Sequence, residues 1–586
     1  MSDPIRIANC SGFFGDRISG AREMVEGGPI DVLTGDWLAE LTMLILAKTA
    51  AKRPGAGYAR TFVTAMEDVM GPCLDKGIRV VSNAGGLDPE NCAAALHEIA
   101  QKLGLNPKIA FVRGDDLMPG IGELIERDQL HHFETGESIS DPTRFLTANA
   151  YLGCWGIVDA LEGGADIVVT GRVTDAAVVC GPAAWHHGWK RTDWNELAGA
   201  VAAGHVIECS SQATGGNYSF FHEVPGIERL GFPWAEIAAD GSCVVGKHDD
   251  GLGGQVSLGT ITSQLLYEIG GHEYFGPDVT TRFDTIQLEQ VEKDRVRIFG
   301  TQGEPPPDTL KVCMNRDGGF RNDMRVCLTG LDIERKAEVV EAAFWRACPY
   351  EPSDYEQVQT RLIRTEKLDP GSNEEAAAIW HISVKDPDAK KTGRAFSNAV
   401  TELALSTIPG FFGVGGGPSA GRPFGVYEPA RVPAHSVPQE VVFLGGETHR
   451  IDSVIPPGEN EIVPAAGPDA PLATGATRRA PLGALFGARS GDKGGNANLG
   501  VFARTDAAWI WLDSFLTKER LSELLPEVGQ FEVDRHRFPA LRSLNFLVHG
   551  ILEEGVAAAT RQDGQAKSLG EWLRARVVEI PESLFE

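Results

Sequence analysis

The fold expected from the sequence follows from one stretch, the apolar run Ala165-Asp166-Ile167-Val168-Val169 and the residues Thr170-Gly171-Arg172-Val173-Thr174-Asp175 directly after it. A short apolar run that ends in turn residues is typical of a strand buried on both faces. Four earlier runs follow the same pattern, at residues 5–8, 29–33, 78–81 and 108–112. Helix-like stretches lie between them. The alternation predicts an α/β fold with a parallel sheet covered on both sides.

Each of the five runs ends in a burst of Gly, Asp, Asn, Ser or Arg. Ligands of open α/β sheets bind outside the carboxyl ends of the strands. We therefore expect these bursts to lie along one edge and to form one site. The substrate-binding residues expected from the first four bursts are Ser11, Arg17, Asp36, Asn83 and Arg113. For Arg17 the alternative is an ordinary βα turn with the arginine in a structural ion pair.

The fifth burst carries two residues with catalytic potential, Arg172 and Asp175. Arg172 can hold a carboxylate or a phosphate through two parallel hydrogen bonds. Asp175 could orient this arginine or act as a base, and as an alternative Thr174 or Asp175 could cap the helix that follows. We keep Arg172 and Asp175 as candidate catalytic residues.

The densest polar cluster spans residues 204–217. A desolvated carboxyl there would have a raised pKa, so Glu208 is a candidate general acid or base. Cys209 is a candidate nucleophile if His205 stabilises its thiolate. The alternatives are a structural ion pair or cap for Glu208 and inert packing for Cys209. The remaining polar side chains expected to bind substrate here are Gln212, Thr214 and Asn217.

The C-terminal part has its strongest pattern at residues 488–500, between two strand-like segments. Paired cations, amides and glycines suit the binding of a phosphate or a carboxylate. The candidate binding residues are Arg489, Ser490, Asp492, Lys493 and Asn496. The alternative is a long hairpin loop with a polar tip.

Composition limits the classes of function. The 586 residues carry a net charge of −27, which disfavours non-specific binding to nucleic acids or anionic membranes. No apolar run reaches the roughly 18–20 residues that span a bilayer, and no signal peptide is visible, so we expect a cytoplasmic protein.

The ten cysteines are scattered without a C-x-x-C pair, so neither a disulfide scaffold nor a zinc ribbon is expected. No G-x-G-x-x-G or G-K-[ST] motif indicates a nucleotide site. His186-His187 and His272-Glu273 lack converging ligands, so we expect no metal site.

The pattern along the chain predicts four segments. Residues 1–225 form the parallel α/β core, and residues 226–452 form an α+β extension with short strands and two helices. Residues 453–479 have the Pro, Gly and Ala content of a linker. Residues 480–586 are expected to form a small ferredoxin-like domain with two helices on a sheet.

Several helices are expected at particular places. Residues 38–51 form an apolar helix, and Asp88 caps a helix that runs through Leu103. In the C-terminal domain, residues 507–525 and 569–578 are each expected to be one helix, and residues 482–486 to be a strand.

In these motifs the chain resembles the acyclic terpene utilisation (AtuA-like) family over nearly its whole length. The stretches that carry the resemblance are residues 9–17, 34–40, 82–86, 170–175, 208–216 and 489–496. The resemblance implies a core followed by a ferredoxin-fold C-terminal domain. It also implies a role in the catabolism of branched, isoprenoid-like acids as CoA thioesters. It supplies no catalytic assignment, so the candidate residues rest on their chemistry.

The expected function is that of a hydratase or lyase that acts on a branched acyl-CoA or a related carboxylic intermediate. Such an enzyme needs an acid/base and a group that holds the developing negative charge. Glu208 or Asp175 would be the acid/base, and Arg172 with backbone amides near Gly215 would hold the charge. Arg489 and Lys493 would bind the phosphates of the CoA handle, or complete the site of a neighbouring subunit.

No tightly bound cofactor is expected beyond CoA as part of the substrate, and we expect a homo-oligomer. The alternatives are a non-catalytic binding or scaffold subunit for a degradation pathway and a metal- or cysteine-dependent hydrolase.

Overall fold

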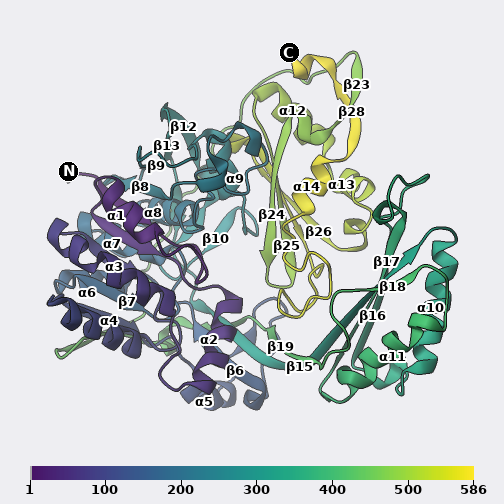
Figure 1. Cartoon of the computed structure of the whole chain (residues 1–586). Helices are drawn as coiled ribbons and strands as arrows, with labels where there is room; N and C mark the ends of the chain where they lie inside the picture. Colours follow the sequence, from purple (N-terminus) through teal and green to yellow (C-terminus); the bar gives the residue numbers. More distant parts are fainter. Residues whose placement is uncertain (1–2) are drawn as a thin grey trace. The chain divides into compact units, whose positions relative to one another are not determined.

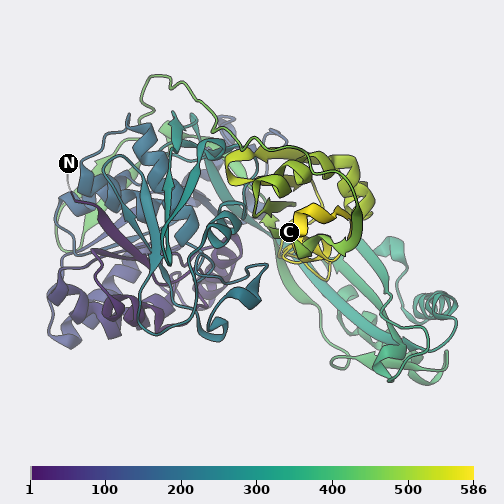
Figure 2. The same ribbon diagram turned by 90° about the horizontal axis from the view of Figure 1, so that it is seen from above.

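The computed structural model describes residues 3–586, and the chain divides into two compact units (Figures 1 and 2). The first unit holds the residues up to 315, residues 427–556 and residues 565–586. The second unit holds residues 316–426 and 557–564. The four segments expected from the sequence were defined by changes in composition, whereas the two units are defined by contacts in the structure. The boundaries of the four segments stay a prediction.

The predicted parallel sheet is present in the first unit (Figure 1). Its five parallel strands lie in the order β1 (Ile5–Asn9), β2 (Val32–Gly35), β3 (Arg79–Ser82), β7 (Ile167–Thr170) and β4 (Ile109–Arg113). Side chains that alternate along these strands enter two different cores. Ile7, Val81 and Val168 pack on one face, while Ala8, Val80 and Val169 pack on the other. Burial on both faces explains why each run is continuously apolar.

Helices cover both faces of this sheet. One face carries α1 (Gly20–Gly27), α3 (Arg60–Lys76) and α4 (Pro89–Leu103). The other face carries α6 (Trp155–Glu162), α7 (Ala177–His187) and α8 (Trp194–Ile207).

Two predictions about helix starts have different outcomes. Asp88 caps α4 by accepting a hydrogen bond from Asn91 N, as predicted. The predicted cap at Thr174 or Asp175 is wrong, because α7 begins at Ala177 with Ala176 in the capping position and no side-chain cap. The apolar helix expected at 38–51 is α2 (Glu40–Lys52).

The sheet extends beyond the five parallel strands to eleven in all. At one edge, β8 (Pro233–Ile237), β9 (Cys243–Lys247), β13 (Arg295–Phe299) and β12 (Gln287–Glu292) add in antiparallel fashion. At the other edge, β21 (Gln439–Phe443) and β22 (Thr448–Ile451) follow β4. This α+β extension also includes α9 (Leu258–Leu265), which precedes a segment of the site described below.

The second unit is a sheet with helices on one face. Its strands include β16 (Gln357–Ile363), β17 (Ala377–Asp386) and the far half of the long strand β15 (Thr309–Thr329). The helices α10 (Ile333–Ala347) and α11 (Phe396–Glu402) pack against Val326, Trp380 and Ile382 of this sheet.

The C-terminal domain has a four-stranded antiparallel sheet in the order β24 (Phe486–Lys493), β25 (Asn496–Ala503), β27 (Ser543–Val548) and β26 (Val533–Phe538). Its helices are α12 (Asp506–Phe515), α13 (Lys518–Leu524) and α14 (Leu569–Arg574), and they share one apolar core with the strands. The predicted ferredoxin-like α/β class agrees with these elements.

Three details of this domain differ from the expectation. The single helix at 507–525 is two helices, because Leu516 leaves the helical conformation and Thr517 caps α13 through Arg520 N. The helix expected at 569–578 ends at Arg574, because the β-branched Val577 and Val578 pair in β28 (Val577–Pro581) with β23 (Thr477–Pro481). Residues 482–484 form a 3₁₀ turn, and the strand begins at Phe486.

The segment at 488–500 is not a long loop. Residues 486–493 and 496–503 pair as strands, and only Gly494 and Gly495 form the turn. Gly494 has a φ of +63°, a left-handed conformation that glycine adopts without strain. The polar side chains therefore stand on a rigid hairpin rather than on a flexible loop.

Residues 453–476, between β22 and β23, contain no helix or strand in the described chain (Figure 2). Hydrogen bonds nevertheless connect this segment to other parts of the first unit. Asn460 Nδ2 donates to Asn195 Oδ1 at 2.8 Å, and Val463 N donates to Gln302 Oε1 at 3.0 Å. None of the described helices combines the length and the apolar character that crossing a bilayer requires.

Candidate functional site

A cavity of about 1430 Å³ lies in the first unit, and every residue that lines it belongs to that unit. Its walls come from the loops after β1, β2 and β7, from the end of α8, from residues 267–277 after α9, and from the β24–β25 hairpin. The volume exceeds the roughly 300–1,000 Å³ of most small-molecule sites. Three of the five strand ends and the C-terminal hairpin therefore share one space.

Arg172 lines the cavity with only 2% of its side chain exposed. Its Nη1 donates to Asp175 Oδ1 at 2.9 Å, and its guanidinium stacks on the ring of Tyr151 at 4.2 Å. Burial opposes the charge of Arg172, but Asp175, Tyr151 and Asp36 outweigh burial and raise its pKa. The Nε atom has no hydrogen-bond partner among the described residues. Arg172 is thus a fixed cation in the cavity wall, and its buried Nε is not used by another described residue.

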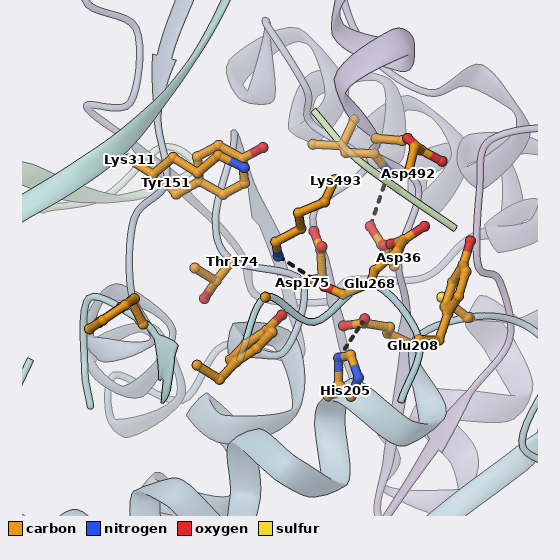
Figure 3. A pocket seen from close by; sticks show the side chains of 18 of the residues that line it. Asp36, Tyr151, Thr174, Asp175, His205, Glu208, Glu268, Lys311, Asp492 and Lys493 are labelled. Atoms are coloured by element: carbon orange, nitrogen blue, oxygen red, sulfur yellow. Dashed lines mark hydrogen bonds and ion pairs between the residues drawn. The ribbon is translucent and has the colours of Figure 1, made fainter. Parts of the chain in front are cut away.

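Glu208 follows the last residue of α8 and faces the same cavity (Figure 3). Its carboxyl is buried, and Oε1 lies 3.4 Å from His205 Nδ1. The Oε2 atom has no hydrogen-bond partner within residues 3–586. Burial, with the charges of Asp175 and Glu268, raises the pKa of Glu208 well above its ordinary value. Glu208 therefore keeps its proton to a higher pH than an ordinary glutamate does.

His205 does not act as a cation beside Glu208. Burial, followed by the nearby charge of Lys493, lowers the pKa of His205 to about 4. The imidazole is neutral at physiological pH, and its edge packs against Tyr274 and Phe283 at 5.2 and 5.3 Å between ring centroids.

Asp36 is the second buried carboxyl of the cavity. Its Oδ1 accepts hydrogen bonds from Asn83 Nδ2 at 2.5 Å and from Leu38 N at 3.0 Å. Burial, together with the charge of Asp175, raises the pKa of Asp36 well above its ordinary value. Asn83 itself lies behind Asp36 and also accepts a hydrogen bond from Trp37 N, so it positions the carboxyl.

The C-terminal hairpin contributes Lys493, Asp492 and Asn496 to the cavity. Lys493 Nζ donates to the carbonyl of Glu268 at 2.9 Å (Figure 3). Glu268 has a φ of +57°, an uncommon conformation for glutamate, and its N–H donates to Asn498 Oδ1 of β25. The docked hairpin therefore holds the backbone of Glu268 at the cavity wall.

The structure places the candidate residues in two groups. Those that line the cavity are Asp36, Arg172, Asp175, Glu208, Cys209, Gln212, Asn217, Asp492, Lys493 and Asn496. Those that do not line it are Ser11, Arg17, Asn83, Arg113, Thr214, Arg489 and Ser490.

Most members of the second group are bound to the protein itself. Arg17 pairs with Glu23 at 2.6 Å, and Arg113 pairs with Glu440 at 2.9 Å. Ser11, Thr214 and Ser490 bond to backbone groups at Phe13, Ser211 and Gly231, and Gly570. Arg489 is buried, donates to Gln212 Oε1 at 2.5 Å and stacks on Tyr267 at 3.9 Å. It supports Gln212, which does line the cavity.

Burial raises the pKa of Cys209 well above its ordinary value, and the charge of Glu208 adds to that effect. A nucleophilic cysteine needs the opposite shift. His205 lies close to Glu208, and its lowered pKa leaves it neutral. It therefore supplies no positive charge that would stabilise a thiolate at Cys209.

Sequence reasoning missed several residues of the cavity, among them Tyr151, Glu268, Lys311 and Arg431. They lie outside the polar bursts that follow the five apolar runs, although Glu268 is followed closely by Gly270 and Gly271. Lys311 and Arg431 belong to an antiparallel strand pair whose partners are 120 positions apart in the sequence. No local signal marks them.

The chain is an α/β protein whose parallel sheet is covered by helices on both faces. Its candidate site lies at the strand ends, where buried acids and the ferredoxin-like domain line one cavity. The chain belongs to the acyclic terpene utilisation family AtuA, whose family model matches residues 5–443. The model of the AtuA ferredoxin-like domain matches residues 480–579. None of the curated proteins matches the chain. The family description is consistent with a role in catabolism.

Proposed function

We propose that the chain is a catabolic enzyme that performs acid–base chemistry on a carboxylic acid derivative, with Glu208 as the general acid/base. The observation that carries this proposal is the buried carboxyl of Glu208, which faces the cavity with Oε2 lacking a partner in the described chain. A carboxyl with a raised pKa can donate a proton to substrate carbon or oxygen at neutral pH.

Arg172 supplies the second requirement, a fixed positive charge for a carboxylate or a developing oxyanion. Its guanidinium is held by Asp175 and Tyr151, so a ligand would meet it without reorganisation. The ion pair leaves Asp175 next to this anion holder, where it can take a proton from water.

The reaction that fits best is hydration or dehydration, with lyase cleavage as a related outcome. In hydration, Glu208 would transfer its proton to the carbon next to the carbonyl. Asp175 would accept a proton from water, whose oxygen bonds to the neighbouring carbon. The net change is one added water. The raised pKa of Cys209 argues against a thiolate nucleophile in this scheme.

We propose a branched acyl-CoA as the substrate, with CoA as a part of the substrate rather than a resident cofactor. The family description supports a terpenoid acid as the acyl group. The cavity of about 1430 Å³ has room for a ligand of this size.

The test is turnover followed by mass spectrometry, with saturated and unsaturated branched acyl-CoAs and the matching free acids. A mass change of one water, or loss of a fragment, on a thioester supports the proposal. Absence of turnover across the panel, together with stable co-purification of another enzyme, would favour a binding or scaffold subunit instead.

A further inference from the structure

Two cations lie directly opposite each other in the cavity wall. Lys311 of β15 and Arg431 of β20 (Ala430–Pro433) are register partners in an antiparallel pair, and both line the cavity. Like charges in this position destabilise a strand pair. Two cations on one wall of a cavity can bind an anionic group of a ligand.

Aromatic rings hold both cations in place. Lys311 Nζ and the guanidinium of Arg431 lie 5.9 and 4.6 Å from the ring centroid of Phe133. Arg431 also donates to the carbonyl of Phe133. It makes no ion pair with a carboxylate in the part of the chain that the structure describes, so its charge is open to a ligand.

The pair is close to Arg172 through a shared ring. Arg172 and Lys311 lie 4.2 and 5.0 Å from the ring centroid of Tyr151, so their charges are no more than about 9 Å apart. Figure 3 shows Lys311 beside Tyr151, away from Glu208 and His205 in this view. The backbone fixes the arrangement, because Tyr151 N donates to the carbonyl of Lys311 at 2.8 Å.

The cavity carries far less net negative charge than the chain as a whole. Six Lys and Arg side chains and seven Asp and Glu side chains line it, in a chain of net charge −27. Burial raises the pKa of two of these acids, Asp36 and Glu208. Glu134, an acid that also lines the cavity, accepts a hydrogen bond from Asn496 Nδ2 at 2.9 Å.

We infer that Lys311 and Arg431, with Phe133 between them, form a subsite for a second anionic group of the ligand, a carboxylate or a phosphate. The inference rests on the proposed function in one respect, since it takes Arg172 as the holder of the first anionic group. The short spacing favours a carboxylate on the acyl skeleton over the phosphates of CoA, because the arm that joins the thioester to those phosphates is longer. The ligand class is then a compact dianion, such as a dicarboxylate or its monothioester.

The test measures binding and does not require turnover. Calorimetric titration would compare glutarate, butyrate, inorganic pyrophosphate and free CoA on the wild type, Lys311→Gln and Arg431→Gln. We expect each substitution to weaken glutarate binding about tenfold or more, as for the loss of a charge-assisted hydrogen bond, and to leave butyrate binding unchanged. Arg297→Gln is the matched control, because Arg297 is a strand arginine stacked on Phe299 at 5.0 Å outside the cavity.

A second readout checks folding. Each of the two substitutions should keep the cooperative thermal unfolding transition of the ligand-free protein, so that any loss of binding is not a loss of the fold. Weakened binding of pyrophosphate and CoA, with glutarate unaffected, would assign the subsite to phosphate. Unchanged affinities for all probes in both variants would overturn the inference, whatever the result for Glu208.

Discussion

His205 Nδ1 and Glu208 Oε1 lie 3.4 Å apart at the end of α8, and both side chains are buried. Burial acts on them in opposite directions, since it lowers the pKa of His205 to about 4 and raises the pKa of Glu208. Both shifts favour the neutral forms of the two side chains and oppose an ion pair between them. A protonated carboxyl at a cavity wall is what a general acid requires, because its O–H group is the proton donor.

Replacement of Glu208 by glutamine removes the acidic proton of the carboxyl group and keeps the size and shape of the side chain. We expect turnover to fall about 10²- to 10⁴-fold, as for the loss of a general acid/base, with the fold intact. Steady-state kinetics and thermal unfolding measured on the same samples check this. The control is Glu273→Gln, an exposed carboxylate of the same cavity. Activity that survives Glu208→Gln, or that is lost only together with the fold, would contradict the assignment.

The same variant changes the pH dependence of stability. The folded chain keeps the proton of Glu208 at pH values where the unfolded chain, with a pKa near 4.5, has lost it. The wild type should therefore lose stability relative to Glu208→Gln as the pH rises above about 4.5. Denaturant titrations from pH 4 to pH 8 measure the difference, and a difference that does not vary with pH would argue against a buried neutral carboxyl.

His205 gives a pH effect of the opposite sign. Its pKa is about 4 in the folded chain and 6.5 as the ordinary value, so the unfolded chain binds an extra proton between these pH values. This contribution to stability is complete above pH 6.5 and is lost as the pH falls toward 4, by up to roughly 3 kcal/mol. His205→Gln should remove this acid-side loss in denaturant titrations. His97→Gln, an exposed histidine of α4, should leave it in place. Parallel curves for His205→Gln and the wild type would refute the prediction.

Arg172 should not tolerate lysine. Lysine has neither the planar fork that bonds Asp175 nor the flat face that stacks on Tyr151. We expect Arg172→Lys to lower kcat/KM about 10- to 100-fold, a loss of roughly 1.5–3 kcal/mol in charge-assisted hydrogen bonding. Arg113→Lys is the matched control, because Arg113 pairs with Glu440 outside the cavity. Equal kinetics for the two variants would remove Arg172 from the site.

The docking of the C-terminal hairpin depends on a small residue at position 500. A Cβ at Gly500 would lie 2.5 Å from the Cβ of Leu266, which is too close for a non-bonded contact. We expect Gly500→Ala to cost about 1–3 kcal/mol of unfolding free energy, as for overpacking. Gly122→Ala, where nothing lies within 4 Å of the new Cβ, should be neutral or stabilising in the same denaturation experiment. Full stability of Gly500→Ala would show that the hairpin can shift.

The sequence alone determined the parallel sheet, its five strands and the ferredoxin-like domain. Continuous apolar runs such as 165–169 report burial on both faces, which is a local property. The same reasoning found Glu208, Arg172 and Lys493 as candidates from residue type and position. Sequence reasoning did not predict the helix break near Leu516, which the cap at Thr517 determines. It also did not predict the tight turn at Gly494, which the pairing of β24 with β25 determines.

Only the tertiary structure decided which polar residues converge. Arg17 and Arg172 both follow strand-like runs. Arg17 pairs with Glu23 and donates to the carbonyl of Leu230, 213 positions away, whereas Arg172 lines the cavity. Lys311 and Arg431 meet through a strand register across 120 positions, and no local pattern encodes that pairing. Chemistry at a site depends on partners and burial, and these are set by contacts between distant segments rather than by the spacing of neighbours.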